Sequence, residues 1–160
     1  IHSTPSIVAD NPVLGQLITT DLQYDSRSAF TLSLNHRETY TGITDRDRAL
    51  TTRRFGELAG EVYELSNSEA MEALGKEFRT PGHIPLCRES PGGLSKRQGH
   101  TELAVAIARL SGNIPCTIGA EMLDPDGDGA LSLQEARKYA KEHGIPMITG
   151  NDILESMDMV

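Results

Sequence analysis

The sequence predicts one domain that contains both helices and strands, with at least part of its sheet parallel. Residues 28–35 alternate apolar and polar side chains, which is the period of a half-buried strand. Residues 103–110 instead repeat apolar side chains at helical spacing. Strand-like runs at 114–118 and 145–149 flank a helical segment, an order that predicts a right-handed βαβ unit. A chain of 160 residues is long enough to bury a core.

Composition excludes two classes of function. The formal charge of −8 and the 4% of aromatic residues argue against a nucleic-acid surface, which needs basic or stacking side chains. The sequence contains no apolar run of membrane-spanning length and no signal-like start, so we expect a soluble, cytoplasmic protein. Cys87 and Cys116 have no metal-binding spacing, and we expect both to be buried thiols.

The first half of the chain predicts a strand followed by two helices. Phe30, Leu32 and Leu34 share one face of the strand at 28–35. Apolar side chains at helical spacing then predict a helix over about 47–63, and Ser66 begins a capping box for a shorter one. The alternating acidic and basic residues at 45–48 either contact a sugar phosphate or form solvated ion pairs.

Residues 78–88 are interpreted as a functional loop. Pro81 and Pro85 remove two donors that a strand interior would need, and Gly82 frees the backbone between them. His83 lies in the same run, where it is either catalytic or a structural, exposed histidine.

Residues 96–102 stand directly before the apolar stripe of 103–110 and must therefore lie at a helix N-terminus. That position binds anions, because the first N–H groups have no partner and carry the positive end of the helix dipole. Gly99 permits close approach, Arg97 adds donors, and His100 is a possible metal ligand or acid–base group. The alternative is a capped helix behind a basic loop.

The last third predicts strands and capped helices. Gly112 is placed to end the helix at 103–110, and Glu121 follows the strand-like run at 114–118. A carboxylate there lines a cleft or stays solvated. Ser132 begins a helix that stops at Gly144, and Asn151 or Asp152 is expected to cap a last short helix.

Residues 124–135 match the calcium loop of an EF-hand. The diagnostic positions are occupied by Asp124, Asp126, Asp128, Gly129 and Glu135. An EF-hand also needs an entering helix, whereas the preceding residues 114–119 are β-branched and interrupted by proline and glycine. A turn that ends in an N-capped helix is the simpler interpretation, with calcium binding as the alternative.

Several ordered motifs together resemble the 3,4-dihydroxy-2-butanone 4-phosphate synthase family, and most closely its archaeal members. They are residues 24–30, 41–45, 78–83 and 97–102, followed by Glu121. The resemblance implies an α+β fold, with a mixed sheet flanked by helices in three layers. It implies conversion of D-ribulose 5-phosphate to L-3,4-dihydroxy-2-butanone 4-phosphate and formate in riboflavin biosynthesis. It further implies Mg²⁺ or Mn²⁺ as cofactor and a homodimer as the active form.

The resemblance also assigns roles to residues. His83 and Glu121 would be essential to the chemistry, and His100 would be a metal ligand. The substrate and its phosphate would be surrounded by Arg97, Gln98, Gly99, His100 and Thr101. These roles suit the reaction, because rearranging a ketose phosphate moves protons next to a carbonyl and develops negative charge on oxygen.

Two departures from the family pattern stand out. Ala120 replaces the usual cysteine before the glutamate, and no acidic loop of the metal-binding kind occurs near the N-terminus. The chain starts at Ile1 without an initiator methionine. We therefore expect residues 1–160 to be a single, N-terminally incomplete synthase domain that is inactive alone. The alternative function is a non-catalytic remnant or a calcium-binding module that uses residues 124–135.

Overall fold

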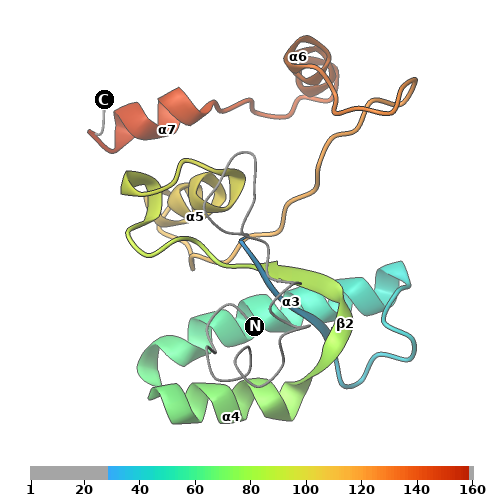
Figure 1. The fold of residues 1–160 in the computed structure, drawn as a ribbon, viewed down its shortest axis with the longest axis vertical. Helices are drawn as coiled ribbons and strands as arrows, with labels where there is room; N and C mark the ends of the chain where they lie inside the picture. The colour runs from blue at the N-terminus through green and yellow to red at the C-terminus, as the bar shows by residue number, and fades with distance from the viewer. Residues whose placement is uncertain (1–28, 159–160) are drawn as a thin grey trace, which may run out of the picture.

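The computed structural model describes residues 29–158 and has the predicted α+β character (Figure 1). Two strands form an antiparallel sheet, β1 (Phe30–His36) and β2 (Phe78–Cys87). The helices are α3 (Asp45–Glu61), α4 (Asn67–Glu77), α5 (His100–Leu110), α6 (Leu133–Glu142) and α7 (Gly150–Ser156). Short 3₁₀ turns occur at Val62–Glu64 and Gly93–Ser95. The motif residues 24–28 lie outside the described part of the chain.

The segment predicted as a loop is strand β2, with a large irregularity in its middle. Leu34 pairs with Ile84, but the next residue of β1, Asn35, pairs with Arg79, so residues 80–83 bulge out of the ladder. Both prolines are tolerated because Pro81 lies in this bulge and because, within residues 29–158, each of the two strands has a strand neighbour on one side only.

The sheet, α3 and α4 enclose one apolar core. Leu34, Leu58 and Phe78 are its buried members, and the ring of Phe55 meets Phe78 edge-on at 5.8 Å between centroids. Leu34 is buried as the alternation predicted, whereas Phe30 is 62% exposed and Leu32 is also exposed. The core therefore covers only the end of β1 that packs against α3.

A second, smaller core joins α5 to α7. Its buried members are Leu94, Ala106 and Ile153. The predicted helix at 103–110 is confirmed as α5, but only part of its apolar stripe is covered, because Ile107 and Leu110 remain exposed.

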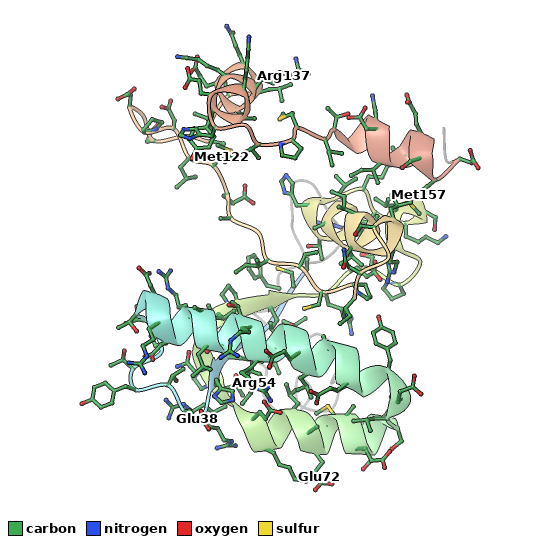
Figure 2. All side chains as sticks on the ribbon, turned by 180° about the vertical axis from the view of Figure 1, so that it is seen from behind. Glu38, Arg54, Glu72, Met122, Arg137 and Met157 are labelled. Atoms are coloured by element: carbon green, nitrogen blue, oxygen red, sulfur yellow. The ribbon has the colours of Figure 1, made fainter. Side chains whose placement is uncertain are left out.

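The predicted βαβ unit is wrong for the described residues. Neither 114–118 nor 145–149 forms a strand, and Ile118 is 78% exposed. A strand needs a neighbour for its backbone hydrogen bonds, and the only paired strands within 29–158 are β1 and β2. The chain instead runs extended from α5 towards α6, at the end of the molecule remote from α4 (Figure 1). Met122, half exposed in that stretch, lies far from Glu72 of α4 (Figure 2).

Most predicted helix boundaries are confirmed. The Ser66–Glu69 capping box begins α4, and the hydroxyl of Ser132 accepts the N–H of Glu135 at the start of α6. The last helix was predicted to begin with Asn151 or Asp152 as its N-cap, which is wrong. Thr149 is the N-cap of α7, and Asp152 is its partner in the capping box.

Two further properties follow from the described residues. Cys87 is exposed, contrary to the expectation of a buried thiol, while Cys116 is half-buried and burial raises the pKa of its thiol. Within residues 29–158, none of the helices combines the length and the apolar character that a bilayer crossing requires.

Candidate active site

The N-terminus of α5 presents backbone donors. Gly99 is its N-cap, with extended backbone, and as a glycine it contributes no capping side chain. The N–H of Glu102 donates to its own carboxylate, which leaves the N–H groups of His100 and Thr101 at the positive end of the helix dipole. This confirms the predicted location of residues 96–102 at a helix N-terminus, a geometry suited to a phosphate.

His100 and Glu121 meet beside this helix end. His100 is the first residue of α5, Glu121 belongs to the extended chain after it, and His100 Nδ1 lies 3.8 Å from Glu121 Oε1. Their side chains are 92% and 76% exposed. The structure thus brings together an imidazole and a carboxylate, both open to a substrate, from residues that the sequence singled out separately.

Arg97 is held over the same helix end by a buried ion pair. Its Nη1 donates to the carboxylate of Glu102, whose side chain is fully buried and also accepts the N–H of Ser90 at 2.8 Å. A Cβ on Gly99 would lie 2.2 Å from Arg97 Nη1, so the guanidinium lies against this glycine. A larger residue here would have to displace the guanidinium of Arg97.

The electrostatics of Glu102 favour its charged form. Burial alone would raise the pKa of this carboxyl group, but the N–H of Ser90 and the guanidinium of Arg97 outweigh it and lower the pKa. Glu102 is therefore a structural anion that orients Arg97. Of the other predicted substrate contacts, Gln98 is exposed and Thr101 is half-buried.

His83 lies in the bulge of β2, and its partner is Asn35. The backbone N–H of His83 donates to Asn35 Oδ1 at 2.8 Å, and the ring Nδ1 lies 3.1 Å from Asn35 Nδ2. Among the described residues His83 forms no hydrogen bond or ion pair with His100 or Glu121. The predicted catalytic residues are therefore divided between two separate supports, the sheet and the start of α5.

Sequence reasoning missed Asn35 and misjudged Asp47. Asn35 was assigned to the polar face of its strand but is only 4% exposed. Asp47 is buried, and its carboxylate accepts the N–H of Gly42 at 2.7 Å. This hydrogen bond lowers the pKa of the carboxyl group. Burial opposes the effect, and the N–H of Thr41 adds to it. Asp45 and Arg48 form the solvated ion pair that was one of the two interpretations. No sequence signal marked Asn35, because burial of a polar strand residue depends on the packing of the sheet.

The described residues supply part of a metal site at most. They contain no group of three or more histidine, cysteine, aspartate or glutamate side chains placed to hold one ion. His100 and Glu121 offer one imidazole and one carboxylate, whereas Mg²⁺ prefers six oxygen ligands including water and substrate oxygens. A complete site needs ligands beyond these two.

Residues 124–135 form a turn and not an EF-hand. Leu123 bridges to Ala130, the N–H of Asp124 donates to the carbonyl of Gly129 at 2.9 Å, and extended chain stands where the entering helix would be. The turn ends at Ser132, the N-cap of α6. This confirms the interpretation as a turn that leads into an N-capped helix.

Fold and site together define an α+β protein that presents a histidine–glutamate pair at an open helix N-terminus. The sequence model of the 3,4-dihydroxy-2-butanone 4-phosphate synthase family matches residues 8–156. The chain belongs to this family, as the ordered motifs predicted.

Several similar proteins are named 3,4-dihydroxy-2-butanone 4-phosphate synthase. The synthase of Methanosarcina mazei is 46% identical over 145 residues, which cover 89% of this chain and 57% of the relative. That of Archaeoglobus fulgidus is 47% identical over 84% of this chain and 55% of its own length. A crystal structure of the Candida albicans synthase superposes with a TM-score of 0.64 at 33% identity, covering 81% of this chain and 60% of that chain. The chain thus spans less than two thirds of the length of these relatives.

Proposed function

We propose that the protein to which this chain belongs converts D-ribulose 5-phosphate to L-3,4-dihydroxy-2-butanone 4-phosphate and formate, a step of riboflavin biosynthesis. The family match over residues 8–156 carries the proposal. The site supports it, because an uncapped helix N-terminus suits the phosphate and the His100–Glu121 pair stands beside it.

The residues divide the work by their chemistry. The N–H groups at the start of α5 and the guanidinium of Arg97 bind the phosphate, which contributes remote binding energy and fixes the sugar. Glu121 and His83 supply the acid–base and hydrogen-bonding groups that the rearrangement needs at the carbonyl and its neighbouring carbons. His100, exposed at the start of α5, would contact the substrate and would be one ligand of a divalent cation that stabilises negative charge on the substrate oxygens.

The cofactor, assembly and location are part of the proposal. A bound Mg²⁺ or Mn²⁺ would supply charge stabilisation at the enediolate oxygens. The carboxylate ligands that residues 29–158 lack would come from sequence upstream of Ile1, in a cytoplasmic homodimer. Residues 1–160 alone would then be inactive or nearly so.

Formate release tests the proposal directly. The protein with its native upstream sequence and the isolated residues 1–160 are incubated with D-ribulose 5-phosphate and Mg²⁺, after circular dichroism has shown that both fold. We expect formate only from the longer chain. Equal release from both would show that the metal site is complete within residues 1–160, and release from neither under any divalent metal would contradict the function.

A further inference from the structure

We propose that Asn35 is the positioning residue for His83, and that it holds the imidazole as the neutral tautomer with its proton on Nε2. The consequence for turnover rests on the proposed function. The tautomer is a property of the chain itself and is measurable without substrate.

The bulge in β2 creates the need for Asn35. Because residues 80–83 leave the ladder, the N–H groups of Gly82 and His83 lose their strand partners. Side chains of β1 replace them: Ser33 Oγ accepts from Gly82 at 3.2 Å, and Asn35 Oδ1 accepts from His83 at 2.8 Å. Asn35 therefore holds the backbone of His83 as well as its ring.

The backbone contact fixes which way the amide of Asn35 points. A backbone N–H only donates, so the Asn35 atom that it meets must be the oxygen. The amide nitrogen Nδ2 is then the atom 3.1 Å from His83 Nδ1. Since an amide NH₂ group only donates, Nδ1 must accept, and the ring proton of the neutral imidazole is on Nε2.

The other protonation forms of the ring fit this contact poorly. A proton on Nδ1 would oppose the N–H of Asn35 Nδ2 at 3.1 Å, and it would need Oδ1, at 3.2 Å, to accept a second hydrogen bond beside that of the backbone N–H. The charged groups on neighbouring elements are engaged elsewhere: Arg79 donates to the carbonyl of Thr39, and Asp47 accepts from Gly42. Within residues 29–158, the ring of His83 forms no hydrogen bond or ion pair with a carboxylate.

Close packing keeps the amide from turning over. Asn35 is 4% exposed, and a Cβ on Gly42 would lie 2.1 Å from Asn35 Nδ2. A Cβ on Gly82 would lie 1.9 Å from the carbonyl carbon of Leu34. Both glycines are therefore required for the backbone to approach Asn35 and its neighbour so closely.

This arrangement assigns different work to the two proposed catalytic residues. Nε2 is on the side of the ring away from Asn35, and His83 is exposed. His83 thus meets the substrate as a neutral donor, giving the Nε2 proton in a hydrogen bond to a substrate oxygen. The proton leaving carbon is then taken by the carboxylate of Glu121.

The tautomer is tested by ¹⁵N-detected NMR of the imidazole in the protein with its native upstream sequence, near pH 7 and without substrate. We expect the His83 Nε2–H signature in the parent. Asn35→Asp replaces the amide donor by a carboxylate and should move His83 to the Nδ1–H or doubly protonated form. Ser33→Ala, which removes only the neighbouring bulge contact, should leave the signature unchanged.

Kinetics supply the second readout. Asn35→Asp and Asn35→Ala should lower kcat about tenfold to a hundredfold while KM changes less than about threefold, and Ser33→Ala should retain the parental kcat. An Nδ1–H signature in the parent, or an unchanged signature in Asn35→Asp, overturns the proposal whatever the activity. If NMR shows the expected tautomers but no formate is released from the parent, the proposed function fails and the role of Asn35 in holding the ring stands.

Discussion

His83 and the His100–Glu121 pair are supported in different ways. The backbone and ring of His83 are held by a buried asparagine, in a bulge above the core of Leu34 and Phe78. His100 and Glu121 stand 92% and 76% exposed, and their closest approach to each other is 3.8 Å. The fold therefore fixes the proposed catalytic histidine His83 without substrate, whereas nothing within residues 29–158 holds His100 and Glu121 as closely.

Removing the two proposed catalytic groups should give the largest effect. His83→Ala and Glu121→Gln each remove a proposed proton-handling group, so we expect kcat to fall about 10²–10⁴-fold with KM nearly unchanged. Steady-state kinetics measure both constants. A change in KM alone for His83→Ala would mean that this histidine only binds the substrate.

Gly82→Ala tests the close strand contact at the bulge that carries His83. The new Cβ would collide with the Leu34 carbonyl carbon at 1.9 Å, and we expect a loss of about 3 kcal/mol in the free energy of unfolding. Urea denaturation measures the loss. The control is Gly75→Ala in α4, where a Cβ meets nothing within 4 Å and a gain of about 0.5–1 kcal/mol is expected. Equal stability of the two variants would contradict the close strand contact at the bulge.

Arg97→Ala tests how much the buried ion pair with Glu102 stabilises the fold. It leaves the buried carboxylate of Glu102 without its cation, which costs about 3 kcal/mol near pH 7. Because the folded-state pKa of Glu102 is lowered, the ion pair stabilises the fold above the ordinary carboxyl pKa of 4.5 and is lost as pH falls through the lower, folded-state value.

The difference between parent and Arg97→Ala should therefore shrink as the pH of the urea titration is lowered below about 4.5. Lys138→Ala removes an exposed pair with Glu135 and should cost less than about 0.5 kcal/mol. A pH-independent loss in Arg97→Ala would assign Arg97 a packing role only.

The smallest expected effect concerns calcium. The turn at residues 124–135 lacks an entering helix, so we expect calorimetry to show no site of micromolar or better affinity. Tight binding that is lost in Glu135→Ala would overturn this and favour a calcium-binding module.

The sequence predicted local structure where local chemistry decides it. The caps at Ser66 and Ser132, the helix at 103–110 and the helix-terminal glycines Gly112 and Gly144 depend on neighbouring residues and are confirmed. The ordered motifs also identified the family correctly.

What failed depends on partners far along the chain. Ile118 and its neighbours have strand propensity, but within the described chain no strand pairs with them. Residues 80–83 read as a loop because a bulge, like a loop, lacks ladder hydrogen bonds. Asn35 was hidden because a polar strand residue looks the same whether it faces water or a histidine.

The proposed synthase activity is tested most directly by the product balance of the protein with its native upstream sequence. D-ribulose 5-phosphate and Mg²⁺ are supplied, and formate and the four-carbon phosphate are quantified by ¹³C NMR with substrate labelled at every carbon. We expect one formate and one 3,4-dihydroxy-2-butanone 4-phosphate for each substrate consumed, with both products lost in Glu121→Gln. A folded protein that consumes no substrate with Mg²⁺ or Mn²⁺, or one that releases a five-carbon product without formate, would contradict the proposed activity.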